Sequence, residues 1–595
     1  MRHVFRTTAL AATLCVAASL AVAATAGADT DWPVFGGNWQ HQRHSELTQI
    51  NVHNVNRLEP AWTFDTKVSG SFQATPIVVG RVMYVSLPFN GVVALKADTG
   101  EEIWRYIHDR IKSRPMCCGP ANRGVAVENG LVYMGTVDSR LIALDAQTGK
   151  KVWDVDVTGG EQGVHEDADT LGKDLNTNGG KMTVAGTSGA GINMAPMVVD
   201  GLVIVGITGV GYGLHLDKPD PNAPLGEVVG IAGKYGRRGF MAAFDAKTGQ
   251  QVWKFDTVPA TGWEGHFRKT TPDGVPLPRN IAQEKRELNK YPDAWEYGGG
   301  SAWSTPAIDR ENGLLYFGTG NPSPQMEGSS RPGDNLYTAS LVALDVHTGK
   351  IKWYYQQVPH DQWGYDVASP PVLFTANIKG KQVPAVGEAG KTGWFYAHNR
   401  ITGKLLYKSD SFVPRKNFFK KPTEAGTLIY PGVIGGSNWS PVSVDEQRRD
   451  VFVAGIHWPV RYTLHTLPAN ADHGELKYSS MAPTDDGQRY GILSAINLDT
   501  GKLRWQHKVD QPLIGGVLST ASGLVFTGLG EGKLIAVDAD TGKQLWAGQA
   551  DAGVNAPPVT YTVDGRQYVV AAAGGNKLFG YQTGHTIRAW ALPAP

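Results

Sequence analysis

The sequence has few cysteines, no excess of one charge and no long apolar run in its body. Only 3 of 595 residues are cysteine, and no Cys-x-x-Cys-His motif occurs, so we expect no covalently attached c-type haem. The 56 basic residues nearly equal the 55 acidic ones, which argues against nucleic acid or an anionic membrane as a partner. No Ser/Pro-rich or charged spacer divides the chain, and no coiled-coil pattern suggests a protein partner.

The one extended apolar run lies at the amino terminus. Arginines precede an apolar stretch over 10–24, and Ala26-Gly27-Ala28 is typical of a signal-peptidase site. The stretch is shorter than the roughly 20 residues that a membrane span needs, so a transmembrane anchor is the less favoured alternative. We predict a signal peptide over 1–28 and a periplasmic or secreted protein over 29–595 without a transmembrane anchor.

A short pattern recurs along the predicted mature chain: Asp or Asn, then Thr-Gly, and an aromatic residue four positions after the glycine. Asp and Thr cap local N–H groups and glycine accepts a positive φ, so the pattern predicts a tight turn between two strands, the second of which ends in a buried aromatic side chain. Runs rich in β-formers, each opened by glycine, precede most copies and predict central strands. The aromatic residues of the copies are Trp104, Trp153, Trp253, Trp353, Tyr407, Trp505 and Trp546.

The spacing of the copies predicts the architecture. They recur every 40 to 50 residues, with gaps near 100, and this period is typical of the four-stranded blades of a β-propeller. The visible copies and the long gaps together predict an all-β, eight-bladed β-propeller with Trp-motif repeats, whereas a string of separate β-domains would need linkers. Residues 159–191, 211–238 and 262–297 do not fit a minimal blade, and we expect them to form long loops over the active-site face.

Several motifs in the chain together resemble one enzyme family. They are Cys117-Cys118-Gly-Pro-Ala-Asn-Arg123-Gly, Gly298-Gly-Gly-Ser-Ala-Trp303, Gly318-Thr-Gly-Asn321-Pro and His360-Asp-Gln-Trp363, in addition to the Trp-ended repeat. Each is weak alone, but in this order the set resembles the quinoprotein alcohol dehydrogenases of the soluble, non-haem type. The resemblance extends over nearly the whole mature chain and implies a secreted eight-bladed propeller with pyrroloquinoline quinone on its axis.

The resemblance implies a set of cofactor-binding residues. The adjacent cysteines would form a strained disulfide ring against one face of the quinone, Trp303 would stack on the other, and Lys391 would lie beside the reactive carbonyl. Arg123 and the amide or hydroxyl groups would bind the cofactor's carboxylates and other polar groups. The alternatives are free thiols, a blade-packing tryptophan, turn or core residues, and a surface lysine. The implied cofactor residues are Gln73, Cys117, Cys118, Arg123, Asn193, Thr208, Trp303, Lys391 and Asn438.

The implied metal site departs from the family pattern. Calcium, or a lanthanide in some members, is typically bound by a Glu, an Asn and the catalytic Asp, and Asn321 matches the Asn. Gly211 and Gly364 stand at the Glu and Asp positions. Since calcium prefers six to eight oxygen ligands, either the metal is absent or other groups supply the oxygens.

Asp366 is the most obvious substitute for the missing carboxylate. It lies two residues beyond Gly364, and side chains two apart on a strand share a face. We predict Asp366 as the general base and as a metal ligand with Asn321, and Asp361 as the second choice of base. Three further groups in the insert after Gly211 are candidates to fold back over the site: His215, Asp217 and Glu227.

The resemblance implies oxidation of a small-molecule alcohol to a carbonyl compound. A carboxylate takes the alcohol proton, hydride goes to the quinone, and the electrons pass to a separate carrier such as a cytochrome c. Polyols, polymeric alcohols and sugars are alternative substrates. A non-catalytic scaffold is the alternative of another class, favoured by the two missing metal ligands and opposed by the retained cofactor residues.

Overall fold

Strands dominate the structure. The computed structural model describes residues 29–112, 119–160, 190–211, 235–469, 474–483 and 489–594, together with short strands between 161 and 234. Within these residues there is one α-helix, α2 (Ile281–Glu287), and there are four short 3-10 helices: η1 (Val55–Arg57), η2 (Leu288–Lys290), η3 (Ala294–Tyr297) and η4 (Lys577–Phe579).

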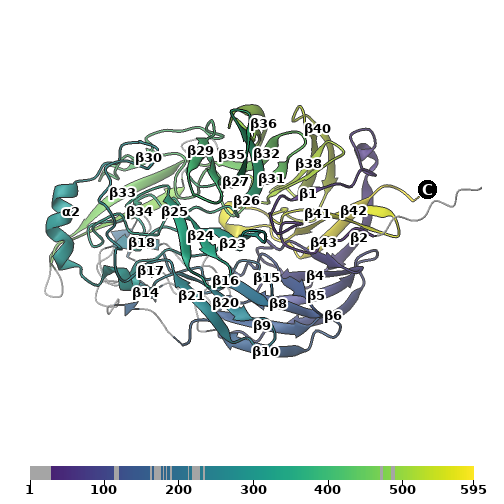
Figure 1. Ribbon diagram of the computed structural model, residues 1–595, viewed down its shortest axis with the longest axis horizontal. Coiled ribbons are helices and arrows are strands. Elements are labelled where there is room, and N and C mark those ends of the chain that lie inside the picture. The colour runs from purple at the N-terminus through teal and green to yellow at the C-terminus, as the bar shows by residue number, and fades with distance from the viewer. Residues whose placement is uncertain are drawn as a thin grey trace, which may run out of the picture.

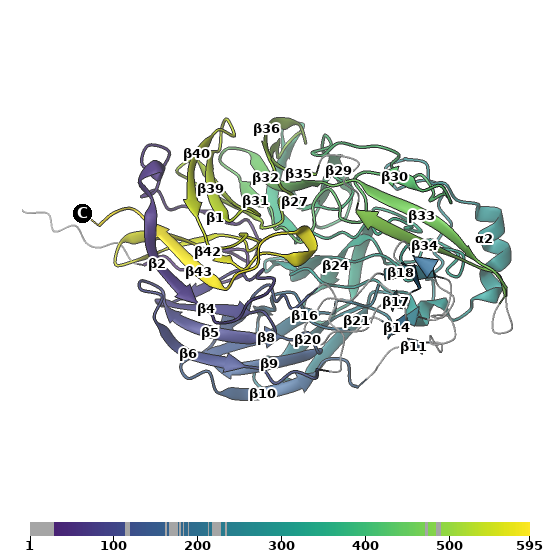
Figure 2. The same cartoon turned by 180° about the vertical axis from the view of Figure 1, so that it is seen from behind.

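Most strands form four-stranded antiparallel sheets that follow one another along the chain (Figures 1 and 2). In the described part of the chain there are eight of them, and β1 (His44–Ser45) extends one as a fifth strand. The strands of the first four sheets, sheet by sheet, are β3 (Ile77–Val79), β4 (Val82–Leu87), β5 (Gly91–Lys96) and β6 (Glu102–Ile107); β7 (Ala126–Glu128), β8 (Leu131–Gly135), β9 (Arg140–Asp145) and β10 (Lys151–Asp156); β15 (Met197–Val199), β16 (Leu202–Gly206), β20 (Phe240–Asp245) and β21 (Gln251–Asp256); and β22 (Ala307–Asp309), β23 (Leu314–Gly318), β24 (Ser340–Asp345) and β25 (Ile351–Gln356). Those of the other four sheets are β26 (Val372–Ile378), β27 (Lys381–Ala389), β28 (Phe395–Asn399) and β29 (Leu405–Lys408); β31 (Ser443–Asp445), β32 (Asp450–His457), β35 (Tyr490–Asn497) and β36 (Leu503–Val509); β37 (Val517–Thr520), β38 (Leu524–Leu529), β39 (Lys533–Asp538) and β40 (Gln544–Gln549); and β41 (Val559–Val563), β42 (Arg566–Ala573), β43 (Thr586–Ala591) and β2 (Glu59–Asp65).

The repeated pattern forms the outer hairpin of a sheet and also joins it to the sheet before it. The Gly149 turn between β9 and β10 has φ +69°, as predicted. A Cβ added to Gly149 would lie 2.5 Å from Trp104 Cε3 of the preceding sheet. The Trp104 indole N–H donates to the carbonyl oxygen of Ala146 in the same turn, at 2.9 Å. The glycine is therefore required both for its positive φ and for the close approach of the neighbouring indole.

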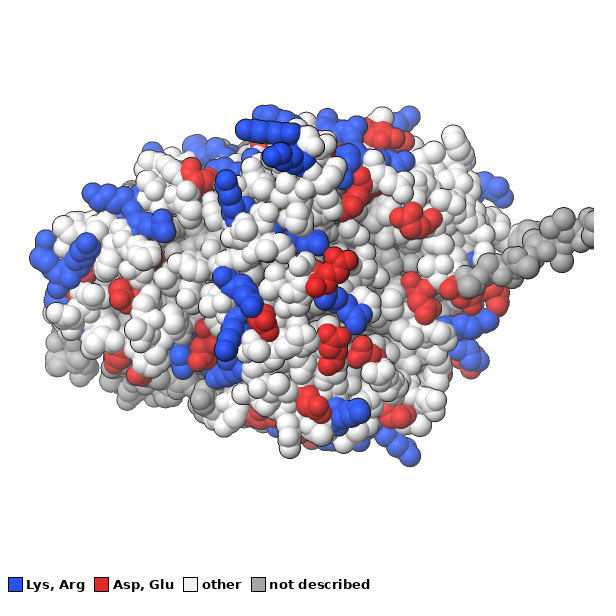
Figure 3. Space-filling view, in the orientation of Figure 1, with Lys and Arg blue, Asp and Glu red and all other residues white. Residues whose placement is uncertain are grey.

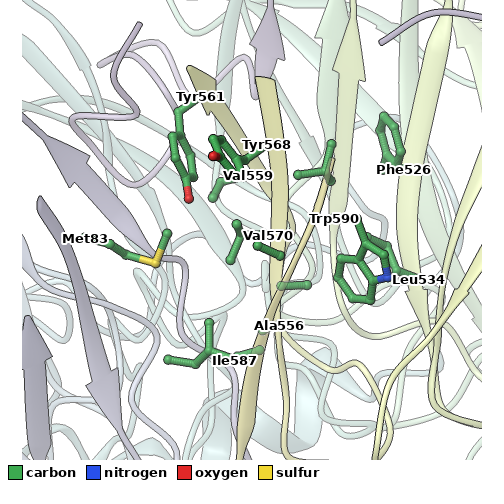
Figure 4. Packing of buried hydrophobic residues seen from close by; sticks show 14 of the residues in the cluster. Met83, Phe526, Leu534, Ala556, Val559, Tyr561, Tyr568, Val570, Ile587 and Trp590 are labelled. Carbon is green, nitrogen blue, oxygen red and sulfur yellow. The ribbon is translucent and has the colours of Figure 1, made fainter. Parts of the chain in front are cut away.

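The amino-terminal and carboxyl-terminal parts of the chain close the ring of sheets. Strand β2 pairs with β43 in an antiparallel register that runs from Glu59 opposite Ala591 to Asp65 opposite Thr586. Buried apolar side chains of β41–β43 pack against Met83 of one neighbouring sheet and Phe526 of the other (Figure 4). A ring of radially arranged meanders closed in this way is a β-propeller.

The segment from Trp32 to Ser45 runs along the first strands of several sheets. Backbone N–H groups of Ile308, Leu373 and Val444, in the first strands of three successive sheets, donate to carbonyl oxygens of this segment at 2.8 Å. β1, at its end, pairs in parallel with β37.

The stretches predicted as long loops contain more regular structure than expected. Residues 262–297 include α2, whose amino terminus is capped by the Asn280 side chain. A six-stranded sheet joins strands from two distant stretches: β14 (Val184–Thr187), β17 (Leu214–Leu216), β18 (Val228–Ile231), β34 (Leu476–Pro483), β33 (Val460–Leu467) and β30 (Thr427–Ile429). Two short antiparallel strand pairs accompany it: β11 (Val164–His165) with β19 (Tyr235–Gly236), and β12 (Asn176–Thr177) with β13 (Gly180–Lys181). The six-stranded sheet and α2 lie on the same side of the ring, away from the carboxyl terminus (Figures 1 and 2).

Basic and acidic side chains are interspersed on the face shown in Figure 3, which agrees with the balanced composition. None of the helices in the described ranges combines the length and the apolar character needed to cross a membrane.

Candidate active site

The predicted site residues that the structure describes occupy equivalent places in different sheets. Each either precedes the first strand of a sheet or follows the second. The two strands are antiparallel, as Ala307 opposite Tyr316 shows, so both places lie at the same end of the sheet. Gln73, Arg123, Asn193, Trp303, Asp366 and Asn438 precede first strands, and Thr208, Asn321 and Lys391 follow second strands. All nine residues are at least nine-tenths buried.

One part of the site is built around Arg123. Its backbone N–H donates to the carbonyl oxygen of Asn193 at 2.9 Å, and its Nη1 donates to the carbonyl oxygen of Trp303 at 3.2 Å. The guanidinium carbon lies 5.1 Å from the centre of the Trp303 ring and 5.6 Å from that of Trp439. Since an arginine over two aromatic faces is held by cation–π attraction, this cation has a fixed place beside Trp303.

The other part is a buried ion pair. Lys391 Nζ lies 2.7 Å from Asp366 Oδ2 and also donates to the carbonyl oxygen of Gly364 at 3.1 Å. The backbone N–H of Asn321 donates to Asp366 Oδ1 at 2.5 Å. Both charged side chains are less than a tenth exposed, so the pair is screened little by solvent.

Backbone contacts join the two parts. Ser301, two residues before Trp303, accepts a hydrogen bond from the N–H of Gly320 at 2.8 Å, and Asn321 accepts one from Gly300 at 3.0 Å. The structure therefore brings Trp303 and Arg123 together with Asn321, Asp366 and Lys391.

Asn438 and Thr208 are held locally. Asn438 Nδ2 donates to the carbonyl oxygen of Ile434 at 2.8 Å, and Gly436 in the same loop donates its N–H to the carbonyl oxygen of Lys391 at 2.8 Å. Thr208 exchanges backbone hydrogen bonds with Gly191.

Several buried polar atoms have no hydrogen-bond partner among the described residues, and three of them bear on this site. They are Oε1 of Gln73 and the indole Nε1 atoms of Trp439 and Trp458. Buried polar groups are nearly always paired, so these atoms suit a polar ligand between the sheets. Trp458 follows β32, which is the same structural place as Lys391 after β27.

The loop that bears Asp366 is not the strand that the sequence argument assumed. Residues 361–371 form no strand, and Gly364 has φ +78°. Asp361 organises the loop instead, because its carboxylate accepts the backbone N–H groups of Trp363 at 3.0 Å and Tyr365 at 2.8 Å. Burial raises the pKa of Asp361 to about 6, the backbone N–H groups and Arg331 oppose that rise, and the Asp366 carboxylate adds to it.

The described residues contain no cluster of acidic or other metal-binding side chains at the predicted metal site. None of them belongs to a group of three or more His, Cys, Asp or Glu side chains that could hold a metal. Asn321 turns its Nδ2 towards residue 211, donating to the carbonyl oxygens of Gly211 and Pro322 at 2.9 Å each. A Cβ at Gly364 would lie 2.6 Å from Gln325 Nε2, so a side chain at residue 364 would require its surroundings to rearrange.

Some predicted residues lie outside the described ranges. These are Cys117, Cys118, Asp217 and Glu227, whereas the backbone of His215 lies in β17.

Sequence reasoning did not identify Trp439, Trp458 or Glu388. Trp439 directly follows the predicted Asn438, which was the available signal. Glu388, at the end of β27, is fully buried and accepts a hydrogen bond from Gln357 Nε2 at 2.9 Å. Burial raises the pKa of Glu388 to about 8 against the opposing effect of hydrogen bonds.

Comparison with known proteins identifies the family. The family described as PQQ, "Glucose/ethanol/alcohol dehydrogenase, beta-propeller domain", matches residues 32–418 and 468–569. The chain belongs to this family. Its similarity to quinoprotein alcohol dehydrogenases and its all-β propeller fold, both predicted from the sequence, are thereby confirmed.

Relatives of this PQQ-family chain match it over most of its length. It is 33% identical to a quinohemoprotein alcohol dehydrogenase of Comamonas testosteroni, over 95% of this chain and 76% of the relative. It is 32% identical to the quinoprotein alcohol dehydrogenase PedH of Pseudomonas putida, over 90% of this chain and 84% of the relative.

Solved structures agree with these sequence relationships. The crystal structure of the Comamonas testosteroni quinohemoprotein alcohol dehydrogenase superimposes with a TM-score of 0.74 and 31% identity, over 95% of this chain and 81% of that one. A europium-containing methanol dehydrogenase superimposes with a TM-score of 0.73 and 26% identity, over 95% and 98%.

Proposed function

We propose that this protein oxidises an alcohol to a carbonyl compound, with pyrroloquinoline quinone as the hydride acceptor. The observation that supports this most is the buried Lys391–Asp366 ion pair, held next to the Arg123–Trp303 contact in a member of the PQQ family. A scaffold protein gains nothing from burying an ion pair and leaving indole N–H groups without partners.

The residues around Arg123 would bind the cofactor. The Trp303 ring offers a flat face for stacking, and the Arg123 guanidinium and the indole N–H groups of Trp439 and Trp458 offer donors for carboxylates. Gln73, Asn193, Thr208 and Asn438 lie at the same end of the sheets and are proposed as further contacts, and the Cys117–Cys118 pair is proposed for the opposite face. When bound, the quinone supplies the redox chemistry by accepting hydride.

Asp366 and Lys391 would act on the substrate and its acceptor. Asp366 takes the hydroxyl proton on Oδ2, while the Asn321 N–H holds Oδ1 in place. Lys391 places a positive charge where negative charge develops during hydride transfer. Asp361 is the second candidate for the base, and its carboxylate accepts two backbone N–H groups of its own loop.

The wider setting of the proposed enzyme follows from the sequence. The eight meander sheets would be the blades of one eight-bladed propeller over 29–595, with the Trp-motif repeats in their outer hairpins, preceded by a signal peptide over 1–28. The site of action would be the periplasm or the extracellular medium, the substrate a small-molecule alcohol and the electron acceptor a separate carrier such as a cytochrome c. The relatives that are named alcohol dehydrogenases support an alcohol over a polyol, polymeric alcohol or sugar.

The proposal is tested by titrating the purified protein with pyrroloquinoline quinone and following tryptophan fluorescence and quinone absorbance. We expect saturable binding of one quinone per chain, and dye reduction with at least one alcohol of a panel. Binding without any turnover would favour a non-catalytic role, and failure to bind would refute the proposal.

A further inference from the structure

Lys391, a side-chain cation, lies at the site where the family resemblance implies a metal ion. By the family resemblance, Gly211 and Gly364 replace two carboxylates, which removes two negative charges from the site. Removing a divalent cation at the same time leaves the net charge unchanged. Of the charged side chains that the structure describes there, Asp366 and Lys391 neutralise one another at 2.7 Å.

The surrounding donors also oppose a metal ion. Asn321 presents its Nδ2 to the carbonyl oxygen of Gly211, so an N–H group faces the position of the missing ligand. A cation there would meet that N–H group and the Lys391 ammonium, and both would repel it. Restoring a side chain at residue 211 would bring its Cβ within 3.0 Å of Asn321 Nδ2.

Lys391 is arranged to contact a ligand as well as Asp366. An ammonium group has three N–H donors. Two are directed at Asp366 Oδ2 and at the carbonyl oxygen of Gly364. No further acceptor of the Lys391 side chain occurs in the described residues, so one N–H remains for an oxygen of the ligand.

We propose that Lys391 replaces the metal ion, so that this protein binds its quinone and oxidises alcohols without calcium or a lanthanide. This inference rests on the proposed function and specifies its cation. Lys391 supplies the positive charge at the site, and Asp366 accepts the hydroxyl proton.

The test compares quinone affinity with and without metal. The protein is treated with EDTA, its calcium and lanthanide content is measured by mass spectrometry, and pyrroloquinoline quinone is titrated in EDTA, in CaCl₂ and in LaCl₃. We expect no bound metal and the same Kd within about twofold in all three, which corresponds to roughly 0.4 kcal/mol. A Kd that is tenfold or more lower with either metal, or one tightly bound ion per chain, would overturn the inference. No binding in any buffer would instead refute the proposed function itself.

Variants of Lys391 separate its charge from its packing. Lys391→Met should raise the quinone Kd by about tenfold to a hundredfold, the usual worth of a charged hydrogen bond, and neither metal should restore it. Lys391→Arg should stay close to the wild type. Lys502→Met removes an exposed lysine paired with Asp410 at 3.0 Å and serves as the control that leaves binding unchanged.

If Lys391→Met folds poorly, the Lys391→Met/Asp366→Asn double variant, which buries no unpaired charge, is titrated instead. Wild-type affinity in Lys391→Met or in the double variant, or recovery of the affinity of either with calcium or lanthanum, would contradict the proposal.

Discussion

Replacing Asp366 by asparagine should damage both catalysis and stability, by separate mechanisms. The substitution keeps an oxygen for the Asn321 N–H, which now donates at 2.5 Å, but places an NH₂ group or a neutral oxygen opposite Lys391 Nζ. The lysine then remains buried without its carboxylate. The loss of a general base and the loss of an ion-pair partner therefore occur together.

The two effects have different expected sizes. Removing one partner of a buried ion pair costs roughly 3–5 kcal/mol of unfolding free energy. Removing a general base lowers turnover by about 10²–10⁴-fold. The double variant Asp366→Asn/Lys391→Met leaves no unpaired charge, so it should recover most of the lost stability but none of the turnover.

Urea unfolding followed by tryptophan fluorescence and steady-state turnover with the reconstituted protein measure the two effects on the same samples. The stabilities of wild type, both single variants and the double variant complete a double-mutant cycle, which isolates the coupling between the two side chains. A coupling near zero would refute the buried ion pair. Turnover that survives in Asp366→Asn would refute Asp366 as the base.

Three further predictions concern packing, pH and cofactor binding. Gly149→Ala should lower the unfolding free energy in urea by roughly 1–3 kcal/mol more than Gly130→Ala does. Both glycines have a positive φ, but only a Cβ at residue 149 would meet Trp104. Equal losses of stability would contradict this packing. Burial raises the pKa of Glu388 to about 8 from an ordinary value of 4.5, so its protonated form stabilises the folded state fully below pH 4.5 and this contribution is lost as the pH rises through 8. The stability of Glu388→Gln relative to wild type should therefore increase between pH 5 and pH 9 in urea titrations by a few kcal/mol, and a constant difference would show that Glu388 does not titrate in that range. Trp439→Phe keeps an aromatic ring but removes the indole N–H. Quinone titration should therefore give a higher Kd, while the unfolding midpoint stays unchanged. An unchanged Kd would exclude Trp439 from the site.

The sequence predicted the outer hairpins well because their determinants are local. A Thr-Gly turn followed by tryptophan specifies a positive φ and a buried ring within ten residues. The sequence could not show that Trp104 packs on the Gly149 turn of the next sheet, since that contact depends on the radial arrangement of the sheets.

The candidate site was predicted in part, because its residues repeat one structural place at the end of each sheet. Trp303 and Lys391 carried family motifs, whereas Trp458 lies in that place without a motif. Asp366 remains a predicted base, but the strand on which that prediction rested is not present. Its loop is shaped by Asp361 and the positive φ of Gly364, and strand periodicity does not apply to it.

The six-stranded sheet beside the ring was not predicted. It combines strands near residues 184–231 with strands near 427–483, and pairing between stretches so distant leaves no periodic signal in the sequence.

A single-turnover experiment tests whether the protein-bound quinone oxidises an alcohol in the absence of a metal ion. The protein is loaded with pyrroloquinoline quinone in EDTA, freed of excess cofactor and mixed with an alcohol, without oxygen or any electron carrier. We expect reduction of the bound quinone and formation of one carbonyl product per quinone, followed by a halt until an acceptor is added. A quinone that stays oxidised in the presence of every alcohol tested, with no carbonyl product, would contradict this expectation.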